Sequence, residues 1–137
     1  MRLGGELVRG VKTYQPPGQM PPVPAFIDSL DPKLREKLLL HIVKLPQVPR
    51  SGLKEPHYKH FSIERYRSMY ELREKGKVLV RVIFTIQDSG EVMLLHAFIK
   101  RQKRDTMQAL EQSIRILADL REHPEYAVEF KIKEETG

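Results

Sequence analysis

The sequence predicts an α+β fold: a small antiparallel β-sheet, flanked by an N-terminal helical hairpin and a C-terminal helix. The sheet is expected to be a three-strand meander plus an N-terminal strand. Three observations lead to this prediction. Residues 68–99 contain three runs of β-branched and aromatic side chains separated by two turns. Residues 34–45 repeat apolar side chains at helical spacing, and a second helical repeat follows residue 105.

Composition indicates one basic domain. The 137 residues suit a single domain, with a core over about residues 12–121 and a C-terminal extension over residues 122–137. Lysine and arginine number 24 against 18 acidic residues, and the formal net charge of +6 suits a polyanionic partner such as nucleic acid. The absence of cysteine excludes disulfides and cysteine-based zinc sites. No run is long and apolar enough for a signal peptide or a membrane span, so a cytoplasmic protein without membrane contact is expected.

The first elements expected are a short edge strand and a pair of helices. Residues 7–14 place apolar side chains at intervals that allow an edge strand. The proline-dense residues 15–24 must be extended or turned, and a short helix is expected over residues 24–30. Asp31 followed by proline is a typical helix start, and the apolar repeat extends that second helix to residue 45.

Residues 46–61 are expected to form a loop, because proline and glycine interrupt them repeatedly. His57 and His60 lie close together in this segment. Without carboxylate or cysteine support they do not predict a metal site, which needs three or four ligands. His41, on the preceding helix, is expected to have no chemical role.

The meander consists of strands over residues 68–73, 78–86 and 92–99. The middle run is almost continuously β-branched or aromatic, as in a central strand. Gly76 lies in the first turn. The second turn, residues 87–90, combines Asp and Ser side chains that bond their own backbone with a glycine free to take positive φ.

Two polar side chains interrupt the apolar strands of the meander. Arg81 lies in the central strand and His96 in the third. If the second turn is centred on residues 88–89, Arg81 lies directly opposite His96, and Lys100 continues on that face. An arginine here needs water, a carboxylate or an anionic ligand. The favoured interpretation is a cationic concave face, and the alternative is a structural ion pair between Arg81 and Glu71.

A final helix is expected over residues 105–121, with Asp105 as its N-cap and Gln108 as the capping-box partner. This helix follows a cationic run directly, so its free amides are expected near the same anion-attracting region. Beyond it, the alternation in residues 127–132 allows a further edge strand.

Several separated motifs resemble the RelE/HigB superfamily of toxins from bacterial toxin–antitoxin systems, and in particular its phage-derived branch. They are PAFIDSL at residues 24–30 with the helix that follows, YELR at residues 70–73, the strand of Arg81, and LHAFIKR at residues 95–101. The resemblance covers roughly residues 12–120. The last motif usually continues with threonine where Gln102 stands here.

The resemblance implies a RelE-like fold and a metal-independent, ribosome-dependent mRNA endoribonuclease that uses no cofactor. The RNA 2′-hydroxyl would attack the adjacent phosphate, while the protein stabilises charge and moves protons. His96 is the candidate proton carrier, and its alternative role is a structural histidine that is hydrogen-bonded under the last helix. The candidate catalytic residues are Arg73, Arg81, His96, Lys100 and Arg101. The candidate RNA-binding residues are Lys54, Lys59, His60, Arg67, Lys103 and Arg104.

Two other functions remain open on the sequence. One is a gyrase inhibitor of the ParE kind, which shares this fold and needs no Arg–His–Lys cluster. The other is a non-catalytic, phage-derived nucleic-acid-binding protein. For the toxin, the expected partners are a cognate antitoxin with a helix-turn-helix motif, the ribosome and mRNA.

Overall fold

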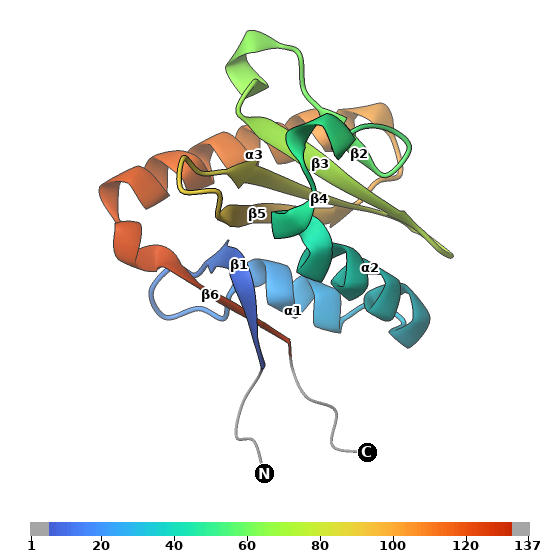
Figure 1. Ribbon diagram of the computed structural model, residues 1–137, viewed down its shortest axis with the longest axis horizontal. Helices are drawn as coiled ribbons and strands as arrows, with labels where there is room; N and C mark the ends of the chain where they lie inside the picture. Colours follow the sequence, from blue (N-terminus) through green and yellow to red (C-terminus); the bar gives the residue numbers. More distant parts are fainter. Residues whose placement is uncertain (1–5, 133–137) are drawn as a thin grey trace.

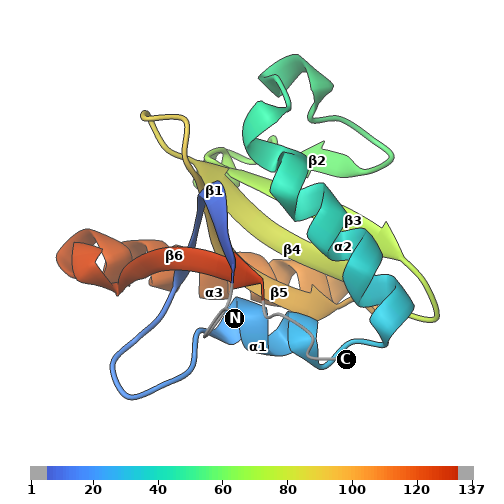
Figure 2. The same ribbon diagram turned by 60° about the horizontal axis from the view of Figure 1, so that its bottom comes forward.

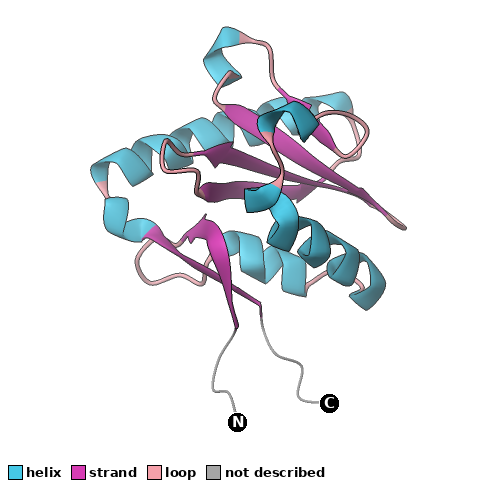
Figure 3. Ribbon diagram, in the orientation of Figure 1, coloured by secondary structure: helices cyan, strands magenta, loops and turns pink. Residues whose placement is uncertain are grey.

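The computed structural model describes residues 6–132, which form a six-stranded mixed sheet with helices on both faces (Figures 1 and 2). Figure 3 separates the strands from the helices and loops around them. None of the helices in this part of the chain is long and apolar enough to cross a membrane. The elements are β1 (Glu6–Tyr14), α1 (Pro22–Asp28), α2 (Pro32–Lys44), η1 (Leu45–Gln47), η2 (Arg50–Gly52), β2 (Tyr58–His60), η3 (Glu64–Tyr66), β3 (Met69–Lys75), β4 (Leu79–Ile86), β5 (Val92–Ile99), α3 (Lys103–Glu122), η4 (Pro124–Tyr126) and β6 (Ala127–Ile132).

The sheet has the strand order β2-β3-β4-β5-β1-β6. The predicted meander is confirmed, because β3, β4 and β5 pair antiparallel in succession. The predicted sheet was too small. It omitted β2, which pairs with β3 from within the expected loop. The further edge strand that the sequence allowed over residues 127–132 is present as β6 and pairs with β1. β1 was also expected at an edge, but it lies between β5 and β6 and runs parallel to β5.

The two N-terminal helices start near the expected positions. The Asp31 side chain accepts a hydrogen bond from the backbone N–H of Lys33 at 3.2 Å, and this confirms it as the N-cap of α2. Both α1 and α2 pack on one face of the sheet, as the predicted hairpin requires (Figure 2).

The predicted start of α3 was wrong by one turn. The N-cap is Gln102, and Asp105 occupies the third helical position instead. Its carboxylate reaches back to accept the backbone N–H groups of Arg101 at 2.8 Å and Gln102 at 2.9 Å. These two bonds are the main reason that the pKa of Asp105 is lowered. Asp105 is therefore the acceptor that closes the first turn of α3, and not the residue that precedes it.

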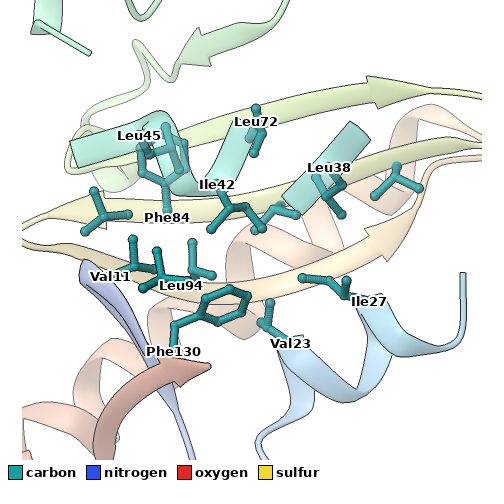
Figure 4. Close-up of a cluster of buried hydrophobic side chains, with 14 of the residues drawn as sticks. Val11, Val23, Ile27, Leu38, Ile42, Leu45, Leu72, Phe84, Leu94 and Phe130 are labelled. Atoms are coloured by element: carbon teal, nitrogen blue, oxygen red, sulfur yellow. The ribbon is translucent and has the colours of Figure 1, made fainter. Parts of the chain in front are cut away.

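The larger apolar cluster fills the space between the sheet and helices α1 and α2 (Figure 4). It includes Phe130 of β6, which is only 1% exposed although it belongs to the segment expected as an extension. Residues of α1 and α2 face residues of all six strands across this space. The labelled members are Val11, Val23, Ile27, Leu38, Ile42, Leu45, Leu72, Phe84, Leu94 and Phe130.

A smaller apolar cluster lies on the opposite face, under α3. Leu110 and Ile116 of α3 pack there with Met69, Ile83 and Leu95 of the sheet. The side chain of Tyr66, from η3, also belongs to this cluster and hydrogen-bonds Glu111 of α3. Arg73, Arg81 and His96 lie on this α3 side of the sheet, whereas His60 pairs with Tyr70 and lies on the face of the larger cluster.

Candidate functional site

A row of paired residues crosses the α3 side of the sheet from its β2 edge. Lys59 of β2 pairs with Glu71 of β3, Glu71 with Ile83 of β4, and Ile83 with His96 of β5. Directly paired residues on neighbouring strands point to the same face. The row therefore places an exposed lysine, a buried carboxylate and a half-buried histidine on one surface.

The next row on this face lies two residues further along the strands. Arg73 of β3 pairs with Arg81 of β4, and Arg81 pairs with Phe98 of β5. The expectation that Arg81 lies directly opposite His96 was therefore wrong. Ile86 pairs with Val92, so the turn is centred on Ser89, and a β-bulge at Leu95 of β5 shifts the register by one residue more. His96 therefore becomes a diagonal neighbour of Arg81.

Glu71 joins the two arginines. Its side chain is 1% exposed, and its Oε1 accepts a hydrogen bond from Nε of Arg73 at 2.9 Å. The same oxygen lies 3.5 Å from Nε of Arg81, so the pair that the sequence offered as a structural alternative is present. On the outer side, Nη1 of Arg73 lies 3.2 Å from a carboxylate oxygen of Glu55, a residue whose side chain is 69% exposed.

The hydrogen-bond donors of Arg81 are only partly used in this arrangement. Its Nη1 donates to the carbonyl of Val80 at 3.2 Å, while its buried Nε and Oε2 of Glu71 have no hydrogen-bond partner within the described chain. The pKa of Arg81 is lowered by burial, an effect that Glu71 opposes and Arg73 reinforces. An arginine stays protonated at neutral pH. Two cations thus share one buried carboxylate. Within residues 6–132, the Nη2 atoms of Arg73 and Arg81 donate no hydrogen bond.

His96 is half-buried, and its ring stacks on Phe98 with centroids 6.0 Å apart. Burial lowers the pKa of His96 below its ordinary value, so the ring is neutral at pH 7. Its side chain makes no hydrogen bond to any residue from 6 to 132. The alternative role, a structural histidine, would require a hydrogen bond under the last helix. A neutral imidazole on the same face as the two arginines, diagonal to Arg81 across β4 and β5, has the chemistry of a proton acceptor.

The cations after β5 lie around the start of α3. Lys100 is half-buried, and its backbone N–H donates to the carbonyl of Leu79 at 2.8 Å, which extends the β4–β5 ladder. The side chains of Arg101, Lys103 and Arg104 are exposed. Asp105 accepts two backbone N–H groups at the helix start, so this N-terminus already holds a carboxylate. Any contribution of these residues to ligand binding must come from their side chains.

The remaining RNA-binding candidates flank β2. Nε2 of His60 is 2.6 Å from the carbonyl oxygen of Arg67, and the His60 ring stacks on Tyr70 at 4.5 Å. Lys59 lies over the ring of Phe61 at 5.7 Å. His60 and Arg67 are thus brought together, and Lys59 joins the row of Glu71. Lys54 is exposed in the preceding loop, and no side-chain contact ties it to this group.

Two carboxylates that bind cationic or histidine side chains of this region were not expected from the sequence. Glu55 contacts Arg73, as described above. Glu74 lies on the opposite face, where it is 6% exposed, hydrogen-bonds Nδ1 of His41 and lies 3.7 Å from Nζ of Lys37. His41 was expected to have no role, and it anchors a buried carboxylate beneath α2. The alternation of side chains along β3 could have predicted the position of Glu74, because it places Glu74 on the same face as Leu72.

Within residues 6–132, no three histidine, aspartate or glutamate side chains gather as a metal site would require. One family model, described as phage derived protein Gp49-like (DUF891), matches residues 25–119. The matched span contains every candidate site residue and ends before β6. The search of curated proteins found no match for the chain.

Proposed function

Because the chain belongs to the phage-derived Gp49-like family, which is part of the RelE/HigB-like toxin clan, we propose that it is the toxin of a toxin–antitoxin system. Its proposed activity is metal-independent endonucleolytic cleavage of mRNA on translating ribosomes. The observation that carries this proposal is the pairing of Arg73 with Arg81 on one face of the sheet, with a neutral histidine on the same face diagonal to Arg81.

The two arginines suit a phosphodiester that gains negative charge during cleavage. Planar guanidinium groups make parallel, charge-assisted hydrogen bonds to phosphate oxygens. Glu71 lies near the Nε atoms of both arginines, and their Nη1 atoms contact Glu55 and the carbonyl of Val80, which leaves the Nη2 donors for a ligand. In this proposal Arg73 and Arg81 hold the scissile phosphate and stabilise the phosphorane.

RNA supplies the nucleophile for this reaction. The 2′-oxygen attacks the adjacent phosphorus, the bond to the 5′-oxygen breaks, and the products carry a 2′,3′-cyclic phosphate and a 5′-hydroxyl. His96 takes the proton from the 2′-hydroxyl, which requires the neutral ring that burial favours. Lys100 or Arg101, which follow the same strand, stabilise or protonate the leaving 5′-oxygen.

The surrounding cations hold the RNA backbone in this proposal. They lie in the loop before β2, on β2, on the connection to β3 and on the first turn of α3. Phosphate contacts of this kind position the RNA and carry little sequence information. The proposed partners are the ribosome with its mRNA, and a cognate antitoxin with a helix-turn-helix motif. The residues assigned to the backbone are Lys54, Lys59, His60, Arg67, Lys103 and Arg104.

The proposal is tested by replacing Arg81. We expect Arg81→Ala to lower cleavage of ribosome-bound mRNA by about 100-fold, the scale for losing one charge-stabilising donor. Arg81→Lys should restore only part of the activity, because an ammonium cannot make the planar two-pronged contact. Cleavage is measured by primer extension on translated mRNA. Ribosome binding should change far less, since many other cations share the backbone contacts.

The thermal midpoint of unfolding of each variant is the control for this test. In Arg81→Ala, Glu71 keeps its 2.9 Å bond to Arg73, so the thermal midpoint should fall only slightly. A stably folded Arg81→Ala protein that cleaves at the wild-type rate would remove Arg81 from the site. If Arg81→Ala and Glu71→Ala instead lower the midpoint equally while the folded fraction of each keeps full activity, the pair is only structural.

The same purified proteins distinguish the two alternative functions from mRNA cleavage. A gyrase inhibitor would block DNA supercoiling and leave mRNA intact. A non-catalytic module would bind ribosomes or RNA without producing a 5′-hydroxyl end.

A further inference from the structure

Strand β6 closes the sheet on the side away from β2, and its outer edge has no strand partner within residues 6–132. It pairs antiparallel with β1 on its inner side only. An unpaired edge exposes a row of backbone N–H and C=O groups that can accept another strand. No proline interrupts residues 127–132, so nothing in this sequence prevents a partner strand from bonding along its length.

The side chains of β6 divide cleanly between the two faces. Phe130 is buried in the larger apolar cluster, and Val128 and Ile132 on the same face are half-buried. Glu129 and Lys131 are exposed on the other face. Neither of these two charges forms an ion pair with a residue of the described chain. The strand therefore offers an apolar row and a row of one negative and one positive charge.

We propose that a second copy of this chain docks on the β6 edge, so that two β6 strands pair antiparallel about a two-fold axis at Phe130. In that register Glu129 lies opposite the partner's Lys131, and Lys131 lies opposite the partner's Glu129. Val128 lies opposite the partner's Ile132, which covers apolar side chains that are half-exposed in the single chain. Opposite charges and apolar pairs in direct cross-strand positions both stabilise a sheet.

Other two-fold registers do not give this complementarity. Centring the pair on Glu129 or on Lys131 places each of those charges opposite its own copy. Centring it between two residues places apolar side chains opposite charged ones, because the side-chain period is two. Charge complementarity thus selects a copy of the same strand, in one register, as the occupant of the edge.

The dimer joins two six-stranded sheets at the ends opposite β2 and β3. The Arg73–Arg81 pair of each copy, on β3 and β4, is then separated from the β6 contact by β5 and β1. The inference therefore does not rest on the proposed RNA cleavage, and disruption of the dimer should leave the cleavage rate unchanged.

The test is sedimentation equilibrium of the full-length chain over a concentration series. The wild type should show a reversible monomer–dimer equilibrium. Lys131→Glu should weaken it by about tenfold, because it creates two pairs of like charges per dimer. Glu129→Lys should do the same, and the combined exchange of both residues should return the dissociation constant close to the wild-type value.

Lys77→Glu is the matched control, since it makes the same charge change in the exposed turn between β3 and β4. It should leave the dimer intact. Amide hydrogen exchange of the wild type gives a second readout that needs no variant: residues 128–132 should become more protected as the protein concentration rises. A wild type that stays monomeric at every soluble concentration overturns the inference. So does a dimer that Lys131→Glu does not weaken, or one that the combined exchange does not restore.

Discussion

The buried carboxylate of Glu71 decides how Arg73 and Arg81 are presented. Two guanidinium groups on directly paired residues repel each other, and burial of Arg81 adds a desolvation cost. One carboxylate oxygen near both Nε atoms compensates these costs and fixes the planes of the two side chains. Its presence does not exclude a ligand, because the charges of the three groups sum to +1. We interpret Glu71 as a positioning residue for the arginines.

The pH dependence of cleavage tests the role of His96. A general base must be unprotonated, and burial lowers the pKa of His96, so the ring stays neutral to a lower pH than an exposed histidine. The rate should therefore fall on the acid side with a midpoint below about 6.5, the ordinary histidine value. Single-turnover rates from about pH 5 to about pH 8 measure this limb.

His96→Gln supplies the control for that profile. It should lower the rate by about 100-fold or more and abolish the acid limb. A wild-type profile that is flat across this range, or a His96→Gln protein with the same limb as the wild type, would contradict the assignment of His96.

Glu55 competes with an anionic ligand for Arg73. The contact between Glu55 and Nη1 of Arg73 is largely exposed, and a phosphate at the proposed site must displace it. Glu55→Gln should therefore tighten binding of a short, non-cleavable RNA by about two- to fivefold, the scale of an exposed ion pair. Fluorescence anisotropy with a labelled oligonucleotide gives the affinity. Glu64→Gln, an exposed change of equal charge in η3, is the control. Equal effects of the two variants would mean that only net charge matters.

At the scale of elements, the bulge in β5 determines which side chains meet. Ile83 pairs with His96 and Phe84 pairs with Leu94, so Leu95 has no direct partner on β4. This extra residue lets both Leu95 and His96 lie on the α3 side of the sheet, the first in the core under α3 and the second at its margin. Sequence alternation alone would have turned one of them to the opposite face.

Strand β6 lies beyond the matched family span, and its contribution to stability is a separate prediction. Phe130 is 1% exposed and its ring lies among the side chains of the larger cluster, beside Leu94 and Val23 (Figure 4). Phe130→Ala should therefore lower the free energy of unfolding by about 3–5 kcal/mol, the usual cost of truncating a buried phenylalanine. Urea denaturation measures the change.

The control for Phe130→Ala is Glu122→Ala, an exposed change at the end of α3, which should stay within about 0.5 kcal/mol of the wild type. A Phe130→Ala protein as stable as this control would show that β6 is dispensable for the core.

At the scale of the whole molecule, the excess positive charge determines how the proposed antitoxin would bind. The chain carries a formal net charge of +6, and the exposed Arg101, Lys103 and Arg104 follow β5, which pairs with the strand of Arg81. A free toxin with this face open would cleave the host's mRNA, so an acidic or amphipathic antitoxin segment should cover Arg73, Arg81 and Lys100. The affinity of that complex should fall as salt rises, because screening weakens contacts between exposed charges.

Calorimetric titration of the toxin with its antitoxin at increasing sodium chloride concentration tests this binding mode. An affinity that does not change with salt would indicate an apolar interface elsewhere on the molecule, for example over the exposed side chains of Leu40 and Val43 on α2.

The sequence by itself determined the type and order of most elements. Local periodicity and capping specify a helix or strand without reference to the rest of the chain. This is why α2, with Asp31 as its N-cap, and the three strands of the meander were predicted close to their observed bounds. Both arginines and the histidine could be recognised for the same reason, since a charged residue within an apolar strand is visible in the sequence alone.

Only the tertiary structure decided which of these residues meet. The place of β1 inside the sheet, the pairing of β2 with β3 and the bulge near His96 depend on contacts between distant segments, and local sequence does not encode them. Strand register is set by which apolar faces bury together, and one inserted residue moves every later pair. For that physical reason the sequence could offer Arg73 and Arg81 as candidates and Glu71 as a partner of Arg81, while the direct pairing of Arg81 with Arg73 and Phe98 emerged only from the folded sheet.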